Sequence, residues 1–210
     1  MSDTAANWRF AEEFVAENDV ILRARAQSLE LGIDAVTPGT GAQLALIAAA
    51  GAATSIIELG TGVGVSGLWM LEGAPTATLT TIDAEPEHLS QARTVFTDAG
   101  LPSTRVRLIA GRALDVLPRM NEGAYDLVFI DADSTHVIDY VEHGLRLVRP
   151  GGTVVVAHAL WRGRVADPAK RDDATAGYRA LLKEIAGSDA VISALSPIGD
   201  GLLQLTTTRG

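Results

Sequence analysis

The sequence contains no cysteine among its 210 residues. This absence excludes a disulfide framework, zinc sites built from thiolates and catalysis by a thiol nucleophile. Positive charge is also scarce, since 17 lysines and arginines stand against 26 acidic residues and the formal net charge is -9. Because affinity for a phosphate backbone comes largely from lysine and arginine, nucleic acid is not an expected partner. The same charge disfavours binding to anionic membrane surfaces.

Long apolar runs are missing as well. No stretch of about 18 apolar residues is free of charge and glycine, so no membrane-spanning helix is predicted. The N-terminal segment 1–18 carries four acidic residues and lacks the basic start and apolar run of a signal peptide. We therefore expect a soluble protein in the cytoplasm. Its length and its 47% of hydrophobic residues fit a single domain, 1–210, with a sizeable core.

Short apolar runs alternate with amphipathic segments along the middle of the chain. This alternation is typical of βαβ units and a parallel sheet. The predicted strands span 55–59, 78–83, 106–110, 127–131 and 153–157. Helices are predicted at 64–71, 86–99, 113–120, 137–148 and 174–185. A helical lead-in, 1–50, precedes the first strand, with one or two helices over 8–31 and another over 42–50.

Two further β-like runs, 191–195 and 202–207, follow the last helix. Only 196–201 separates them, and its proline, glycines and aspartate predict an antiparallel hairpin rather than another crossover. We therefore predict an α/β fold with a doubly wound, seven-stranded, mostly parallel sheet that contains one antiparallel strand. A dehydrogenase domain would ordinarily continue with parallel strands.

A glycine-rich loop follows the first predicted strand and leads into a helix. Its glycines are Gly60, Gly62 and Gly64. Glycines let the backbone approach a ligand closely, and the N-terminus of the next helix offers unpaired N–H groups to an anionic group. The loop is therefore predicted to bind a ligand, although a plain tight turn is the alternative.

Acidic residues near this loop indicate which ligand it holds. A dinucleotide site needs a third glycine three positions after the second, and this chain has Val65 there. Glu58 would repel a pyrophosphate but could pair with the ammonium group of a methionine moiety. Asp83 ends the second strand, where an acidic side chain commonly binds both ribose hydroxyls. Charge therefore favours S-adenosylmethionine (SAM) over NAD, although Asp83 could instead cap the following helix.

Four segments carry a resemblance to a known family: 58–66 (ELGTGVGVS), 80–88 (TTIDAEPEH), 111–118 (GRALDVLP) and 125–133 (YDLVFIDAD). They resemble the small-molecule O-methyltransferases of the catechol and caffeoyl-coenzyme A type, which are class I SAM-dependent enzymes. The likeness extends from about Val36 to the terminal hairpin, where 197–201 (PIGDG) takes part in it. It is similar in particular to actinobacterial members, and it implies a Rossmann-like methyltransferase sheet.

The resemblance implies which residues hold the methionine end of SAM. Val36 would line the pocket from the N-terminal side. The residues expected around the amino acid moiety are Glu58, Gly60, Thr61 and Ser66.

It also implies the surroundings of the ribose and adenine. Asp83 would bind the ribose, and the adenine would lie between Ala84, Arg112 and Ala113. Asp131, at the end of the fourth strand, would lie where cofactor and acceptor meet, which agrees with ligand binding outside the carboxyl ends of such strands. Capping of the next helix is the alternative role for Asp131.

The chain departs from the family where a metal usually binds. In the family, a divalent metal binds two neighbouring acceptor hydroxyls and lowers the pKa of one of them. Its ligands are the aspartate that matches Asp131 and an Asp-Asn pair, for which this chain has Ala157 and His158. Magnesium and calcium need several oxygen ligands, so we predict no magnesium-type site. A softer metal held by His158, Asp131 and Asp133 is the weaker alternative.

The usual base is also replaced, because Ser134 stands where the family often has a lysine. His158 is the expected substitute, since an imidazole titrates near neutrality and the resemblance places it beside Asp131. Two alternatives stay open: the ring of His158 could be structural, or the acceptor could be acidic enough to need no base. The remaining histidines are expected to be solvated or structural: His88, His136 and His143.

We therefore predict an enzyme that transfers a methyl group from SAM to a hydroxyl of a small molecule, with aromatic hydroxyls among the expected acceptors. S-adenosylhomocysteine would be released, and Asp131 and His158 would be catalytic. The alternative is a SAM-binding protein with lost or altered catalysis, acting as a sensor or partner subunit. Trp161 could stack on a planar acceptor or pack on its own domain. A homodimer is expected, with Trp8, Phe10 and Phe14 of the lead-in at the interface.

Overall fold

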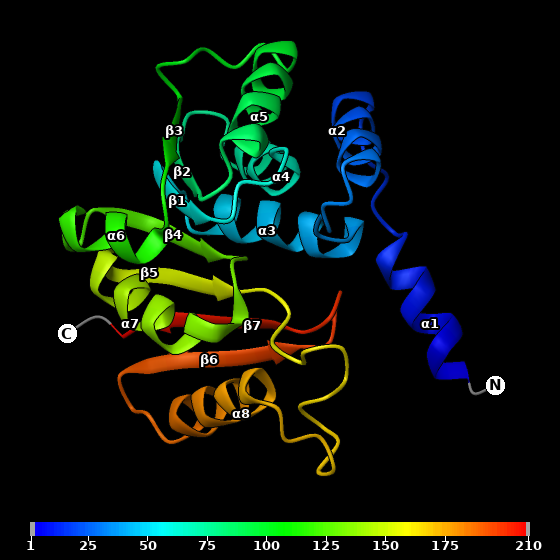
Figure 1. Cartoon of the computed structure of the whole chain (residues 1–210), viewed down its shortest axis with the longest axis vertical. Helices are drawn as coiled ribbons and strands as arrows, with labels where there is room; N and C mark the ends of the chain where they lie inside the picture. The colour runs from blue at the N-terminus through cyan, green and yellow to red at the C-terminus, as the bar shows by residue number, and fades with distance from the viewer. Residues whose placement is uncertain (1–2, 209–210) are drawn as a thin grey trace.

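One seven-stranded sheet forms the centre of the computed structural model, which describes residues 3–208 (Figure 1). The strands lie in the order β3-β2-β1-β4-β5-β7-β6. Their bounds are β1 (Ser55–Leu59), β2 (Thr78–Asp83), β3 (Val106–Ala110), β4 (Tyr125–Ile130), β5 (Val148–Val156), β6 (Val191–Ser196) and β7 (Leu202–Thr207). The winding reverses between β1 and β4, so the carboxyl ends of these neighbouring strands are where ligands bind in doubly wound sheets.

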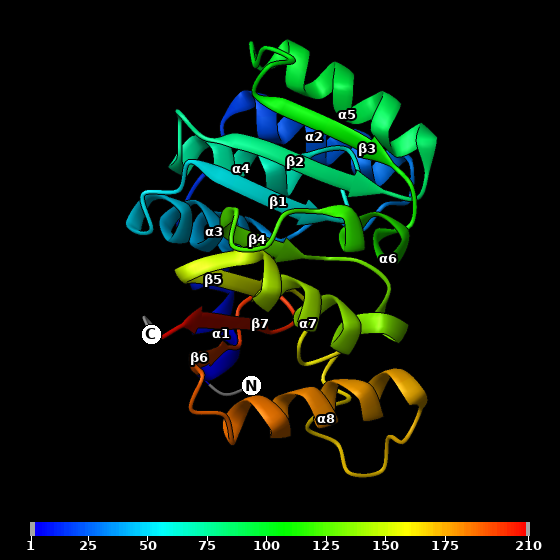
Figure 2. The same ribbon diagram turned by 90° about the vertical axis from the view of Figure 1, so that its left-hand side faces the viewer.

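Helices cover both faces of this sheet (Figure 2). One face is covered by α3 (Pro38–Ala50), α4 (Val65–Gly73) and α5 (Pro86–Asp98), and α2 (Asp19–Glu30) packs on α4 and α5. The other packs against α6 (Ala113–Val116), α7 (Val137–Leu147) and α8 (Asp173–Ala186). The remaining helical elements are α1 (Asp3–Glu12) and the 3-10 turns η1 (Leu117–Arg119) and η2 (Ser134–His136). None of the helices within residues 3–208 combines the length and apolarity needed to span a bilayer.

The predicted hairpin accounts for the one reversed strand. β7 is antiparallel to both β5 and β6, whereas the pairs among β1 to β5 are parallel. Leu195 pairs with Leu203 and Ser196 with Leu202, so the 197–201 loop projects from the end of the hairpin. The predicted fold class, with its single antiparallel strand, is confirmed.

Several element boundaries differ from the predictions. β5 begins at Val148 rather than residue 153, because Val148 already pairs with Tyr125 before the register shifts near Gly151 and Gly152. The helix predicted over 113–120 ends at Val116 and continues as a 3-10 turn that contains Pro118. Asp131 follows β4 instead of ending it.

The lead-in segment 8–31 forms parts of two helices, with residues 13–18 between them. Asn18 starts α2, because its side-chain oxygen accepts hydrogen bonds from the amides of Val20 and Ile21. Leu29 is 80% exposed, whereas Ala24 and Ser28 of the same helix are buried. The buried face of α2 is therefore built mainly from small residues, which is why apolar spacing alone did not locate it.

The amino-terminal edge of the sheet is held together by one carboxylate. Asp126 accepts hydrogen bonds from the backbone amides of Thr54 and Ser55, at 2.6 and 2.9 Å, and from the Arg149 guanidinium. Burial alone would raise the pKa of Asp126, but these bonds outweigh it and hold the pKa at about 2. The starts of β1, β4 and β5 are thus tied together at the edge opposite the ligand-binding loops.

Candidate functional site

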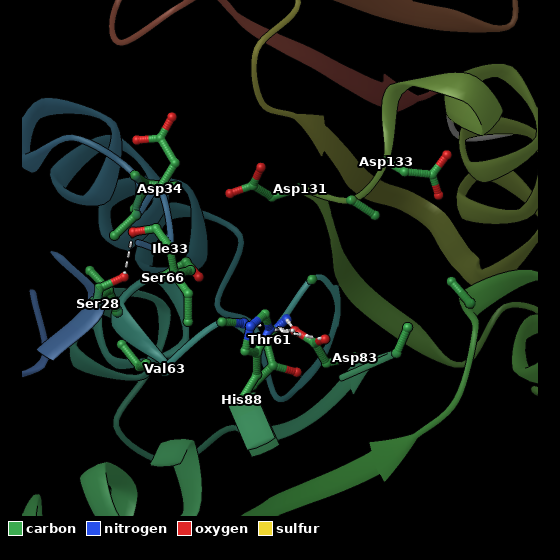
Figure 3. A pocket seen from close by; sticks show the side chains of 18 of the residues that line it. Ser28, Ile33, Asp34, Thr61, Val63, Ser66, Asp83, His88, Asp131 and Asp133 are labelled. Carbon is green, nitrogen blue, oxygen red and sulfur yellow. Dashed lines mark hydrogen bonds and ion pairs between the residues drawn. The ribbon is translucent and has the colours of Figure 1, made fainter. Parts of the chain in front are cut away.

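A cavity of about 460 Å³ lies at the carboxyl ends of β1, β2 and β4 (Figure 3). The wall contains nine of the ten residues predicted to bind the cofactor: Val36, Gly60, Thr61, Ser66, Asp83, Ala84, Arg112, Ala113 and Asp131. The segment between α2 and α3, residues 33–36, closes the cavity from the N-terminal side. Local motifs that lie far apart in the chain are therefore brought to one place by the order of the strands.

The glycine loop lies directly against the chain that follows β4. Gly60 has a φ of +92°, and a Cβ at this residue would lie 1.9 Å from the backbone oxygen of Asp131. Gly64 has a φ of +94° and starts α4, and a Cβ there would meet the Phe96 ring at 2.8 Å. Only glycine combines this conformation with this space. The close approach leaves no space for a side chain between the loop and the chain that follows β4.

Asp83 fixes the conformation of that loop. Its Oδ2 accepts hydrogen bonds from the amides of Thr61 at 3.0 Å and Gly62 at 2.9 Å, and its Oδ1 accepts one from the Glu85 amide at 2.9 Å. A carboxylate has about four lone-pair positions, and these three backbone bonds leave one of them. His88 lies 3.3 Å from the same carboxylate and also lines the cavity, a position that its place in an amphipathic helix did not suggest.

Glu58 is the predicted binding residue that the structure places elsewhere. Its side chain is fully buried behind the cavity wall instead of lining it. The hydroxyls of Ser66 and Thr81 donate hydrogen bonds to its carboxylate at 2.5 and 2.6 Å, and the Thr61 hydroxyl lies 2.7 Å from that of Thr81. Direct contact with an ammonium group is therefore not what the geometry indicates. Glu58 instead supports two residues of the cavity wall, because it is hydrogen-bonded directly to Ser66 and, by way of Thr81, to Thr61.

Burial also changes the acidity of Glu58. Removal from water raises the pKa of its carboxyl to about 8, even though the hydroxyls of Ser66 and Thr81 oppose this effect. The negative charges of Asp131 and Asp83 raise it further. A carboxyl with this pKa keeps its proton at neutral pH, so the polar cluster under the glycine loop carries little net charge.

A second cavity, of about 240 Å³, adjoins the first. The two share Asp34, Ala35 and Val36 as a common wall. The rest of the second cavity is formed by Thr37, Thr40, Ala157, His158, Arg162 and the stretch 199–202. In Figure 3, Asp34 extends from the segment before α3 and Asp131 from the chain that follows β4. The site thus has a larger compartment over the glycine loop and a smaller one beside it.

His158 stands at the junction of the two cavities. Its Nε2 lies 3.4 Å from Oδ1 of Asp131, which lines the larger cavity, and its Nδ1 lies 3.6 Å from Oδ2 of Asp200. The interaction with Asp131 raises the pKa of the imidazole, and the charge of Asp200 adds to this effect. The predicted pair of Asp131 and His158 is therefore assembled, and Asp200 joins it.

The turn that carries His158 has an unusual backbone. His158, Trp161 and Arg162 have φ values of +56°, +46° and +55°, and such positions cost about 1–3 kcal/mol each for residues other than glycine. Asp200 offsets part of this cost, because both of its carboxylate oxygens accept a hydrogen bond from the Arg162 amide. The sequence indicated only a turn around Asp200, and its contacts with His158 and Arg162 were missed.

Trp161 packs on its own domain. Its ring stacks on the buried ring of Tyr178 in α8, with 5.4 Å between ring centroids and an interplanar angle of 28°. This contact anchors the turn to α8. Of the two roles left open for Trp161, the structure shows internal packing.

The donors at the junction do not fit a magnesium-type ion. Within residues 3–208, no group of three or more histidine, aspartate or glutamate side chains is arranged to hold a metal. Asp133, considered above as a ligand of a softer metal, accepts hydrogen bonds from the Tyr140 hydroxyl at 2.5 Å and from the Thr135 amide at 3.2 Å. Asp131 faces an imidazole in place of further oxygen ligands.

Comparison with known proteins agrees with this geometry. The family model described as O-methyltransferase matches residues 13–207. A Mycobacterium tuberculosis protein named "Probable O-methyltransferase" is 46% identical over 93% of this chain and 88% of its own length. A Corynebacterium glutamicum protein of known structure superposes with a TM-score of 0.90 and 33% identity, over 98% of each chain. An O-methyltransferase of Streptomyces achromogenes involved in tomaymycin synthesis, solved with SAM, superposes with a TM-score of 0.85 and 29% identity, over 99% of this chain and 100% of its own.

Glu58 provides a test of the buried cluster. An unfolded glutamate loses its proton near pH 4.5, whereas the folded protein keeps it up to about pH 8. Below this interval Glu58 is protonated in both states, so its burial adds no pH-dependent cost. Across the interval only the folded state is protonated, and the cost to stability grows by up to about 1.4 kcal/mol per pH unit. Glu58→Gln cannot ionise. We expect the free energy of unfolding of the wild type, measured by urea denaturation, to fall relative to that of this variant as the pH rises through the interval.

The control is Glu30→Gln, which alters an exposed carboxylate at the end of α2. Its free energy of unfolding should follow the pH dependence of the wild type. An unchanged difference between wild type and Glu58→Gln at all pH values would show that folding does not raise the pKa of Glu58.

Proposed function

This chain belongs to the O-methyltransferase family, and from that membership we propose that it transfers the methyl group of SAM to a hydroxyl of a small molecule without a magnesium-type metal. The observation that carries the proposal is the pair of adjoining cavities with His158 and Asp131 at their junction. One compartment has the size and polar lining for a nucleoside donor. The other is suited to a smaller acceptor, such as a single aromatic ring.

The residues of the larger cavity fit the parts of SAM. Asp83 would accept hydrogen bonds from the ribose hydroxyls, while Ala84, Arg112 and Ala113 would flank the adenine. The amides of the first turn of α4 and the Ser66 hydroxyl would bind the polar methionine end, with Glu58 holding Ser66 in place. When bound, SAM supplies an electrophilic methyl group on its sulfonium, and S-adenosylhomocysteine is the product. The SAM-bound relative from Streptomyces achromogenes supports this assignment.

The chain's own residues would handle the proton and the orientation of the acceptor. His158 would take the proton from the acceptor hydroxyl at Nε2 or Nδ1, and Asp131 and Asp200 would stabilise the imidazolium that forms. Val36 and Ala35 would hold the acceptor in line, since they line both cavities. Positioning of the two reactants can supply much of the rate, so a metal is not required by the chemistry.

A second candidate function rests on the departure from the family pattern at Ala157 and His158. A chain with this change could bind SAM without transferring its methyl group, as a sensor or partner subunit. The two functions share the larger cavity and differ only in what happens at the junction. The cytoplasmic location expected from the sequence stays a prediction.

Calorimetry and a turnover assay separate these functions. We expect both SAM and S-adenosylhomocysteine to bind, and we expect methyl transfer to a member of a panel of catechols, phenols and other hydroxylated compounds. Because the donors at the junction do not fit a magnesium ion, EDTA should leave the rate unchanged and added magnesium should not raise it. Loss of turnover in EDTA would contradict the metal-free mechanism. Binding without turnover would favour the second candidate, and failure to bind SAM at millimolar concentration would overturn both.

The pH dependence of turnover tests His158. The ring must be neutral to accept a proton, and Asp131 and Asp200 raise the pKa of the imidazole above 6.5. We therefore expect kcat/KM for the acceptor to increase with pH through an apparent pKa above 6.5. His158→Gln should lower kcat by about a hundredfold or more and remove this dependence.

Asp200→Asn adds a directional test. It removes a negative charge from the Nδ1 side of His158 and keeps an oxygen that can accept from the Arg162 amide. The apparent pKa of the acid limb should therefore fall. Asp98→Asn, at an exposed position of α5, should leave the limb where it is. A limb that moves to higher pH in Asp200→Asn would rule out His158 as the titrating group.

We further propose that the protein is a homodimer formed through its N-terminal helices. The side chains of Trp8, Phe10 and Phe14 are 43%, 71% and 74% exposed, and the rings of Phe10 and Phe14 lie 6.4 Å apart, so this helix end presents an exposed apolar cluster. A second copy of the chain would cover them by a self-complementary contact.

Sedimentation velocity tests this assembly. We expect a dimer for the wild type, and dissociation when both Phe10→Glu and Phe14→Glu are introduced, because charges would then be buried without partners. Pro102→Glu, in the exposed loop between α5 and β3, is the control and should remain dimeric. A monomeric wild type would contradict the proposal.

A further inference from the structure

Glu12, the last residue of α1, makes a contact that neither the fold nor the proposed reaction explains. Its Oε1 accepts a hydrogen bond from the Gly199 amide at 2.5 Å, across 187 residues of sequence. Its Oε2 is buried and has no hydrogen-bond partner within the described residues. A carboxylate loses hydration when it is buried in this way, so its position needs a compensating interaction.

The start of α3 provides part of that compensation. A Cβ at Gly39 would lie 2.6 Å from Oε2 of Glu12, so the carboxylate occupies the space left by the missing side chain in the first turn of α3. Negative charge is favourable at the N-terminus of a helix. Glu12 therefore links three elements: α1, the start of α3 and the 197–201 loop.

Gly199 sits tightly in this arrangement. Its φ is +59°, and a Cβ there would lie 2.5 Å from the Thr40 hydroxyl and 3.5 Å from that of Thr37. Thr37, Thr40 and Gly199 all line the smaller cavity. The hydrogen bond to Glu12 thus holds the 197–201 loop against Thr37 and Thr40 in the wall of the smaller cavity.

The next residue in the loop is Asp200, whose two oxygens accept from the Arg162 amide at 2.7 and 2.5 Å. The backbone oxygens of Asp200 and Gly201 also accept hydrogen bonds from the amides of Leu160 and Ala159, at 2.9 Å each. The loop therefore holds the turn that carries His158, and that turn has a strained backbone.

We propose that Glu12 is a positioning residue for the smaller cavity: its carboxylate holds Gly199, and Gly199 fixes Asp200 beside His158. The N-terminal helix is on this account part of the acceptor site, although none of its residues lines either cavity. That the smaller cavity receives the acceptor rests on the proposed function, whereas the mechanical link from Glu12 to His158 does not.

Amide hydrogen exchange, followed by NMR on the full chain, tests the link without any ligand. Glu12→Ala should speed exchange of the Gly199 amide, which loses its acceptor directly. The decisive amide is that of Arg162, which is bonded to Asp200 and does not touch Glu12. We expect the Arg162 amide to exchange about tenfold faster or more. A hydrogen bond to a charged group stabilises a folded segment by a free energy that corresponds to at least such a change in the exchange rate. The Hε1 resonance of His158 should shift, while that of His143 in α7 should not.

Two variants separate positioning from a general effect on folding. Glu12→Gln keeps an oxygen that can accept from Gly199, so it should restore slow exchange at Arg162 to within about threefold of the wild type. Glu13→Ala removes the neighbouring exposed carboxylate and should behave as wild type. The amides of Thr61 and Gly62, bonded to Asp83 in the larger cavity, are internal references that should be unaffected in every variant.

Faster exchange at Gly199 with unchanged exchange at Arg162 would overturn the proposal, because Glu12 would then only dock α1. Equal acceleration at Arg162 and at Thr61 and Gly62, without rescue by Glu12→Gln, would also overturn it, since the effect would be global. Calorimetry with SAM on the same samples keeps the two questions apart. Failure to bind SAM in the wild type would refute the proposed function and leave the exchange result valid.

Discussion

The site depends on one close contact, between the glycine loop after β1 and the chain that leaves β4. Gly60 lies so near the backbone oxygen of Asp131 that a Cβ would reach within 1.9 Å of it. This contact sits where the winding of the sheet reverses, and there the loops of two neighbouring strands diverge over opposite faces. It places the loop along one compartment while Asp131 reaches the junction with the other. Any side chain at residue 60 would push these two walls apart.

The polar groups around this contact form hydrogen bonds to two carboxyl groups, one on the cavity side and one behind the wall. Asp83 holds the loop amides from the cavity side, and Glu58 holds the hydroxyls of Ser66 and Thr81 from behind. The outer carboxylate keeps capacity for a ligand, whereas the inner one is fully buried and retains its proton near neutrality. The loop therefore has a fixed shape before any ligand arrives, which limits the entropy that binding must remove.

The features that were predicted best from the sequence are those that depend on one short segment of the chain. Alternating apolar residues identified the strands, and Gly60, Gly64 and Asp83 fitted a motif whose spacing is set by one strand, one turn and one helix. Contacts between distant segments left no such pattern. The pairing of Asp200 with His158, and of Glu12 with Gly199, arises only when the hairpin returns beside β5 and α1 packs across the start of α3. Glu58 was correctly found at the end of its strand, but the strand's pleat, which turns its side chain into the core, was overlooked.

The departure from the family pattern at Ala157 and His158 is best understood as one change in charge. Asp131 and Asp200 place two carboxylates near a single point, and their mutual repulsion requires a positive group between them. Here an imidazole with a raised pKa occupies the point and can carry the positive charge itself. One side chain thus combines the counter-charge for Asp131 and Asp200 with the ability to take up a proton, which is what the proposed reaction requires at the junction.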